Sequence, residues 1–387
     1  MKICFITPSI FNLGGVQRVV SLLASELVKN YEVDVICTCQ DYDINRELYN
    51  LDERVNIVFN DKLIKRNFYQ KVKRKICKII NKILNDYKLE LEILYPSFIR
   101  DRIKKYLNYQ KYDIVIGVEG DYSILLSLIA DEINSKTIGW MHNSFDAYFE
   151  TKNKYYWGQK NIFKNNLKKL DKCIVLTKED RRLYKEEFGV EVDYIYNPLS
   201  FTTESKSNCL NKNILFVGRL IKEQKGLDYL MEIFKDVSVN NLGWNLIIVG
   251  DGQDKDYLEN YIEKYNLSER VKIFAHTNKI IEFYLNASIF ISTSRWEGFG
   301  LVVTEAMECG LPVIAFNNSG PREIINKSNH NGIIIEKYDL EAFKEALKDL
   351  IDSYELRKKI SKNSITRAND FNKENIIKKW REMFCEL

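Results

Sequence analysis

Residues 288–315 read SIFISTSRWEGFGLVVTEAMECGLPVIA and contain a complete strand–helix–strand unit. The short apolar runs Ser288–Ser292 and Pro312–Ala315 predict two buried strands. Between them, the glycines of Gly298–Gly300 permit a tight turn into a helix that begins near Leu301. Two strands that are joined through a helix lie parallel in one sheet, so this stretch predicts an α/β fold.

The same alternation of Ile- and Val-rich runs with helical patterns extends over most of the chain, without a fixed-period repeat. A first series of strands is followed by a polar stretch that opens with Asn197-Pro198, and then by a second series. The predicted strands are Lys2–Ile6, Val33–Cys37, Val55–Phe59, Asp113–Val118, Lys136–Met141, Lys172–Leu176, Val192–Tyr196, Asn213–Val217, Asn245–Val249, Val271–Phe274, Ser288–Ser292, Pro312–Ala315 and Gly332–Ile335.

Two series of strands predict two Rossmann-like α/β/α domains with parallel sheets that face a central cleft. We place the first domain at residues 1–198, a linker at 199–211 and the second domain at 212–370. The apolar stripe near the end of the chain predicts a helix, residues 371–387, that packs back on the first domain. With 387 residues, 45% of them hydrophobic, the chain suffices for two cores.

Composition indicates an ordered protein that does not cross a bilayer. The opening MKICFITPSIF reads as a buried strand, because its apolar run is too short for a spanning helix and no small-residue cleavage site follows. No run of eighteen apolar residues occurs. The eight cysteines lack the spacing of a zinc site, so we expect reduced thiols and a cytoplasmic location.

The turn before Leu301 carries the first candidate chemistry. Free backbone N–H groups at a helix start form a docking site for anions and hydroxyls. Glu297 precedes the helix and Glu305 lies about one turn inside it, so the two carboxylates can reach different ends of an extended ligand. The structural alternative is that Glu297 is an exposed loop residue and that Glu305 is favoured by the helix dipole.

EGFGLVVTEAMECGLPVIA resembles the signature of the retaining glycosyltransferases of GT-B fold called family 4, whose two glutamates match Glu297 and Glu305. The resemblance implies that Glu297 contacts hydroxyls of the donor sugar and that Glu305 holds the ribose of the nucleotide. It also implies that the backbone N–H groups of Phe299, Gly300 and Leu301 face the sugar and the phosphates.

Residues 213–234, NILFVGRLIKEQKGLDYLMEIF, resemble a second motif of that family, in which a strand ends in Gly-Arg and Lys-Gly follows. Arg219 and Lys225 match its diphosphate-binding cations. A diphosphate needs about two positive charges, and Arg supplies a planar fork where Lys supplies a point charge. Taken alone, each cation also fits a solvated surface.

Three further positions match the family. Gly14 and Gly15, in NLGGVQRVV, correspond to an N-terminal phosphate loop where the backbone approaches the diphosphate and the acceptor. His142, in WMHNSF, follows a predicted strand and matches a histidine that contacts the donor sugar; the alternative is a packed or solvated loop residue. His276, in FAHTNK, lies where the family packs the nucleobase against loop backbone.

Metal chemistry is not expected. Asp41-Tyr42-Asp43 is formally an Asp-x-Asp, but two cations and a helix N-terminus already neutralise a diphosphate without magnesium. Nor do Glu297 and Glu305 form a hydrolase pair, because they would hold opposite ends of a donor. In the family, the leaving phosphate deprotonates the incoming hydroxyl on the same face, so no protein nucleophile is needed. We therefore expect no metal and no cofactor apart from the donor substrate.

Residues 62–84, KLIKRNFYQKVKRKICKIINKIL, contain nine Lys or Arg and no acidic residue. This is the pattern of an amphipathic helix that lies in the surface of an anionic membrane. The alternative, left open here, is a domain helix whose apolar stripe packs on the sheet. Nucleic acid is disfavoured, because few aromatic residues are interspersed and no nucleic-acid fold signature is present. The apolar positions recur at steps of three and four: Ile64, Phe68, Val72, Ile76, Ile79, Ile80 and Ile83.

Together these features predict a retaining, metal-independent glycosyltransferase that moves a hexose or N-acetylhexosamine from a nucleoside diphosphate sugar, expected to be UDP-linked. The second domain would bind the donor, and the first would bind a glycan or lipid-linked glycan acceptor in polysaccharide or capsule biosynthesis. The enzyme would be cytoplasmic and peripheral on the inner face of the membrane. Alternatives are a nucleotide-sugar epimerase on the same fold and a non-catalytic sugar-nucleotide-binding scaffold. A nicotinamide dehydrogenase is disfavoured by the missing G-x-G-x-x-G.

Overall fold

The computed structural model describes residues 1–39, 43–239, 241 and 243–387, and it divides the chain into two compact units. Unit 1 comprises Met1–Ile195 and Ile377–Leu387, and unit 2 comprises Tyr196–Ile376. Two residues of the Asp-x-Asp, Asp41 and Tyr42, lie outside the described residues.

Unit 1 is built on a seven-stranded sheet in the order β3-β2-β1-β4-β5-β6-β7, in which neighbouring strands pair in parallel. Its strands are β1 (Lys2–Thr7), β2 (Glu32–Cys37), β3 (Asn56–Phe59), β4 (Ile114–Val118), β5 (Lys136–Trp140), β6 (Lys172–Val175) and β7 (Asp193–Tyr194). The central strands read as apolar runs because helices cover both faces of such a sheet; all five residues of β4 are buried.

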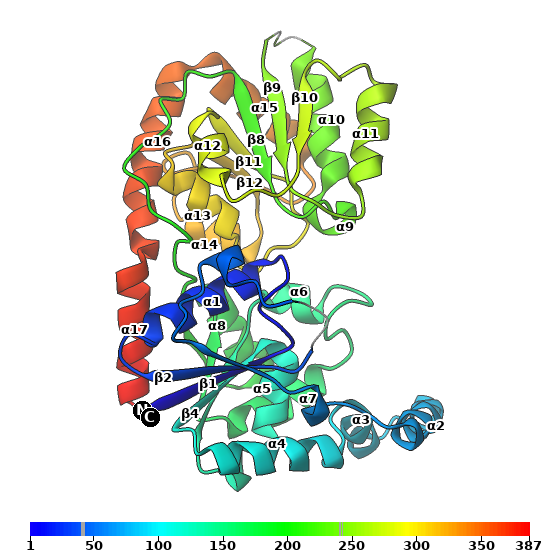
Figure 1. Ribbon diagram of the computed structural model, residues 1–387. Helices are drawn as coiled ribbons and strands as arrows, with labels where there is room; N and C mark the ends of the chain where they lie inside the picture. Colours follow the sequence, from blue (N-terminus) through cyan, green and yellow to red (C-terminus); the bar gives the residue numbers. More distant parts are fainter. Residues whose placement is uncertain (40–42, 240, 242) are drawn as a thin grey trace. The chain divides into compact units, whose positions relative to one another are not determined.

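Helices connect these strands and flank the sheet (Figure 1). The α-helices of unit 1 are α1 (Gly15–Leu27), α2 (Phe68–Leu84), α3 (Tyr87–Leu94), α4 (Ser97–Gln110), α5 (Glu119–Ser127), α6 (Phe145–Phe149), α7 (Lys160–Asn166), α8 (Lys178–Leu183) and most of α17 (Lys373–Cys385). Shorter helical turns include η1 (Arg46–Tyr49) and η2 (Asp61–Leu63).

The C-terminal helix α17 contributes to the core of unit 1. The Trp380 side chain is 1% exposed, and its ring packs edge-on against that of Trp140 with 4.8 Å between centroids. Trp140 ends β5, so α17 covers part of the sheet that the first half of the chain forms.

Unit 2 has a six-stranded parallel sheet in the order β10-β9-β8-β11-β12-β13. Its strands are β8 (Asn213–Val217), β9 (Asn245–Val249), β10 (Val271–Phe274), β11 (Ile289–Ser292), β12 (Val313–Phe316) and β13 (Ile333–Ile335). Its helices are α9 (Lys222–Lys225), α10 (Leu227–Ser238), α11 (Lys255–Lys264), α12 (Ile280–Leu285), α13 (Leu301–Glu308), α14 (Ser319–Ile324), α15 (Leu340–Asp352) and α16 (Tyr354–Ala368). The α/β class with two parallel sheets is confirmed, and each predicted strand is present with boundaries that differ by at most two residues at either end.

The basic segment 62–84 differs from its prediction in two respects. The helix begins only at Phe68, because Asn67 adopts an extended backbone and forms a capping box with Gln70; residues before it form η2 and a loop. No residue of α2 is buried, so for the part of the apolar stripe on α2 the alternative of packing on the sheet is wrong. Ile64, which precedes the helix, packs against the core of unit 1. Instead α2 lies alongside α3 (Figure 1). Among the described residues, no helix is long and apolar enough to span a membrane.

Candidate active site

The turn after β8 positions the two predicted diphosphate-binding cations of unit 2. Arg219 follows the strand, and its Nη2 donates to Oε1 of Gln224 at 3.1 Å. Lys225 ends α9 and is followed by Gly226, whose φ of +60° is left-handed. A Cβ at Gly226 would lie 2.1 Å from the carbonyl oxygen of Thr293, so only glycine allows this close approach to the end of β11.

That approach brings Lys225 against Glu297. Lys225 Nζ lies 2.5 Å from Oε2 of Glu297, and the two side chains are 10% and 16% exposed. The hydroxyl of Ser294 donates to the same carboxylate oxygen at 3.2 Å. Glu297 is therefore not an exposed loop residue. An ammonium has three donors, so Lys225 can bind an anion while it keeps this ion pair.

Glu297 leads into the helix start that the sequence predicted. Gly300 is the N-cap of α13 with a φ of +97°, and among the described residues no side chain caps the first turn. The loop before this helix lies very close to the start of α14. A Cβ at Gly320 would lie only 2.0 Å from the carbonyl oxygen of Phe299, so this close approach requires glycine at position 320. Leu301 begins α13 as predicted. N–H groups at such a helix start are suited to bind hydroxyl or phosphate oxygens, and their contact with a donor stays a prediction.

Glu305 lies inside α13 and is 1% exposed. The hydroxyl of Tyr284, on α12, donates to its Oε2 at 2.9 Å. The alternative of a first-turn residue favoured only by the helix dipole is wrong, because Glu305 lies beyond the first turn and is buried. A buried carboxylate with one oxygen held by Tyr284 is suited to accept a hydrogen bond from a ligand hydroxyl.

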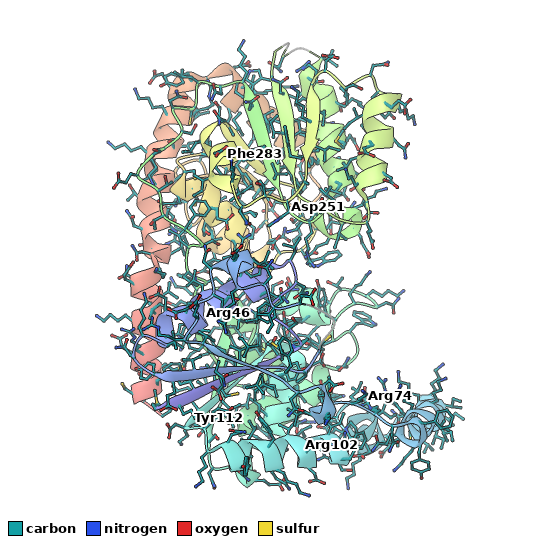
Figure 2. All side chains as sticks on the ribbon, in the orientation of Figure 1. Arg46, Arg74, Arg102, Tyr112, Asp251 and Phe283 are labelled. Atoms are coloured by element: carbon teal, nitrogen blue, oxygen red, sulfur yellow. The ribbon has the colours of Figure 1, made fainter. Side chains whose placement is uncertain are left out.

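His276 is placed by its backbone. Its N–H donates to Oδ2 of Asp251 at 2.8 Å, and this contact ties the loop after β10 to the loop after β9. Figure 2 shows Asp251 at that loop. Both loops follow the carboxyl ends of parallel strands, the edge where α/β sheets bind ligands.

Gly14 and Gly15 of unit 1 lie at the start of α1. Gly15 is its first residue and Gly14 is an N-cap without a side-chain hydrogen bond. The Tyr49 hydroxyl, on η1, accepts from the N–H of Gly14 at 2.8 Å and donates to the carbonyl of Asn12 at 3.1 Å. Tyr49, which the sequence did not single out, thus holds the glycine loop in place.

His142, also in unit 1, is buried two residues after β5. Its ring packs against that of Trp140 with 4.2 Å between centroids, and its backbone N–H donates to the Tyr148 hydroxyl at 3.0 Å. Nε2 is buried and has no hydrogen-bond partner among the described residues. Burial lowers the pKa of His142 to about 3, so the imidazole is neutral at physiological pH. A solvated loop histidine is excluded.

A carboxyl group that the sequence did not single out supports His142. Glu119 directly follows β4 with a φ of +71°, and it accepts a hydrogen bond from the Tyr148 hydroxyl. Burial raises the pKa of Glu119 to about 7. Glu119 could have been proposed from the sequence by its position alone, because it lies at the carboxyl end of a central strand.

Comparison of the sequence with known proteins assigns the chain to a family. Residues 13–201 match the model described as Glycosyltransferase Family 4, and residues 203–367 match that described as Glycosyl transferases group 1. The chain is a GT-B glycosyltransferase of the family 4 type.

Two curated relatives and one solved structure resemble this glycosyltransferase over its whole length. The amylovoran biosynthesis glycosyltransferase AmsD of Erwinia amylovora is 29% identical, over 99% of both chains. An α-1,4-N-acetyl-D-galactosaminyltransferase of Campylobacter jejuni, named for an acceptor on undecaprenol diphosphate, is 24% identical over 100% of this chain and 99% of its own. The structure of Anabaena Alr3699/HepE in complex with UDP has a TM-score of 0.77, 17% identity and 100% coverage of both chains, which supports the shared fold.

Proposed function

We propose that the protein is a retaining, metal-independent glycosyltransferase that moves a hexose or N-acetylhexosamine from a UDP-linked donor to a glycan or lipid-linked glycan in polysaccharide biosynthesis. The observation that carries the proposal is the ion pair of Lys225 and Glu297 beside the uncapped start of α13. It combines a cation for phosphate, a carboxylate for hydroxyls and free N–H groups within one loop cluster. Complexes of HepE with UDP support the choice of nucleotide.

Each group has a proposed task. Arg219 and Lys225 neutralise the diphosphate, and Glu297 accepts from a sugar hydroxyl through the oxygen that Lys225 does not hold. Glu305 accepts from the ribose, and the loop of His276 faces the nucleobase. The neutral Nε2 of His142 is a hydrogen-bond partner for a hydroxyl of the donor sugar.

In the proposed reaction the acceptor hydroxyl oxygen bonds to the anomeric carbon as the bond from that carbon to the phosphate breaks. The leaving phosphate takes the hydroxyl proton on the same face, so configuration is retained and no protein base is consumed. The cations stabilise the charge that develops on the leaving diphosphate, as electrostatic preorganisation requires.

We further propose that the enzyme is peripheral on the inner face of the membrane. Support comes from α2, on which Phe68, Ile79 and Ile83 are 83%, 64% and 82% exposed beside a basic face. A helix of this kind binds an anionic lipid surface, and a lipid-linked acceptor would be presented there.

Thermal-shift screening against a panel of nucleotide sugars tests the donor, because a binder raises the unfolding temperature. Product analysis with the best donor then separates transfer from epimerisation. Glu297→Ala, Arg219→Ala and Lys225→Ala should each abolish most transfer, whereas Glu345→Ala, at an exposed position of α15, should not. EDTA should leave the rate unchanged; strong inhibition by EDTA would overturn metal independence. Glycan transfer that survives Glu297→Ala would overturn the assigned site.

A further inference from the structure

A second cluster of positive charge lies in unit 1, in a pocket of about 700 Å³ at the N-terminal end of α2. Its cations come from two segments that are distant in sequence: Lys62, Lys65 and Arg66 precede α2, and Arg102 and Lys105 lie on α4. Leu63 and Tyr106 add apolar walls. No carboxylate is among the residues that line the pocket.

The two arginines fix the shape of this pocket. Arg102 Nη1 donates to the carbonyls of Lys62 and Lys65, at 3.1 and 2.7 Å. Arg66 Nη2 donates to the carbonyls of Ile93 and Leu94, both at 3.3 Å. These hydrogen bonds fix the segments before α2 and after it. All four acceptors are backbone carbonyls, which carry no net charge, so no carboxylate in the described part of the chain neutralises either guanidinium. Figure 2 shows Arg102 on α4 and Arg74 on α2.

Positive charge therefore exceeds negative charge at this place. Lys65 pairs with Asp61 at 3.3 Å, but within the described residues no carboxylate lies within ion-pair distance of Lys62, Arg66, Arg102 or Lys105. Lys62 and Lys105 are exposed. Like charges that are held together without a counter-ion are costly unless an anion binds between them.

The helix that leaves the pocket has the surface of a membrane-binding element. Along α2, Val72, Ile76, Ile79, Ile80 and Ile83 recur at helical spacing and are 40% to 82% exposed. Its basic residues are Lys71, Lys73, Arg74, Lys75, Lys78 and Lys82. The basic pocket therefore lies next to an exposed apolar helix face. A ligand that has both an anionic group and an apolar part, such as a lipid, fits this combination better than a free anion does.

We propose that this pocket binds the phosphate group of a membrane lipid while the apolar stripe of α2 enters the interface. The ligand class is a phosphorylated lipid headgroup, supplied either by bulk anionic phospholipid or by a phosphate-linked glycan acceptor. The site is separate from the donor cations Arg219 and Lys225, which belong to unit 2. Only the second source rests on the proposed function.

Vesicle flotation with the full chain tests the proposal. Three vesicles are compared: phosphatidylcholine alone, phosphatidylcholine with phosphatidylglycerol, and phosphatidylcholine with a polyprenyl diphosphate. The variants are Lys62→Gln/Lys105→Gln in the pocket and Ile79→Asn/Ile83→Asn on the stripe. Lys359→Gln/Lys362→Gln, at exposed positions of α16 in unit 2, removes the same charge as a control.

The pocket variant should bind the two anionic vesicles at least about tenfold more weakly than the control variant, because each Lys at an anionic lipid surface contributes about 1 kcal/mol. Loss of binding to the phosphatidylglycerol vesicles identifies bulk anionic phospholipid as the source, and loss only with the polyprenyl diphosphate vesicles identifies the acceptor. The stripe variant should lose binding to both anionic vesicles. All substitutions are at exposed positions, so folding should persist.

Equal binding by the pocket and control variants would overturn the proposal, as would a pocket-dependent affinity for duplex DNA without one for vesicles. Nucleotide-sugar thermal shifts separate this outcome from failure of the proposed function. A pocket variant that keeps its donor shift but loses vesicles supports the lipid site, whereas a wild-type protein without any donor shift refutes only the donor chemistry.

Discussion

Substitutions of Lys225 and of Glu297 should lower the free energy of unfolding in a strongly non-additive way, because the two side chains form an ion pair. Removing one partner of a buried pair costs about 3–5 kcal/mol, because the other charge is left uncompensated. With side chains 10% and 16% exposed, and discounting for that solvent contact, we expect about 2–3 kcal/mol for Lys225→Met or Glu297→Gln. The double variant leaves no unpaired charge, so it should be more stable than the sum of the single losses predicts, by about 2 kcal/mol.

Urea unfolding of the wild type, both single variants and the double variant measures this coupling. A chain of two units need not unfold in one step, so the ¹⁹F signal of fluorotryptophan at buried Trp244 reports unit 2 by itself. The matched control is the surface pair of Lys255 and Glu259, at 3.6 Å with side chains 49% and 55% exposed. Its coupling should be about 0.3–0.5 kcal/mol. A coupling at Lys225 and Glu297 no larger than this control would refute the reasoning.

Three further predictions concern unit 1. Trp380→Ala should destabilise it by about 3–5 kcal/mol in urea, because the ring is 1% exposed against Trp140, whereas Lys378→Ala, at a side chain 75% exposed, should change little. Burial raises the pKa of Glu119 to about 7, so its contribution to stability is complete below about pH 4.5 and is lost as the pH rises to about 7; Glu119→Gln should remove this loss from urea midpoints measured between pH 4 and 8. Burial lowers the pKa of His142 to about 3, so the wild type loses stability as the pH falls from 6.5 towards 3, and His142→Gln should reduce this loss. If either Glu119→Gln or His142→Gln leaves the pH dependence of the urea midpoint unchanged, the shifted pKa given for that residue is wrong.

The fold was predictable because central strands of a parallel sheet need apolar residues on both faces, and runs such as those of β4 and β11 are short, apolar and separated by helical patterns. The start of α13 was predictable as well, since few residues other than glycine adopt the backbone found at Gly300. Both features depend on residues that are close together in the sequence, so no tertiary contact is needed to predict them.

The contacts within the site were not predictable in the same way. Lys225 and Glu297 were recognised separately, but their ion pair depends on how closely Gly226 approaches Thr293, and that is a tertiary contact. The sequence also gives no sign that the carboxyl of Glu119 is buried, because its partner Tyr148 lies on another helix. Helical periodicity likewise defined the apolar face of α2 without telling what that face contacts.

The packing of Trp380 on Trp140 also sets an order of events during synthesis. The ribosome makes β5 early, then the whole of unit 2, and only afterwards the residues of α17 that belong to unit 1. Until those residues emerge, the nascent first half displays an aromatic surface that has no cover, and this is the kind of surface that chaperones bind. A premature stop codon just before residue 377 would therefore spare unit 2, with Arg219, Lys225 and Glu297, and would damage the half of the protein that was translated first.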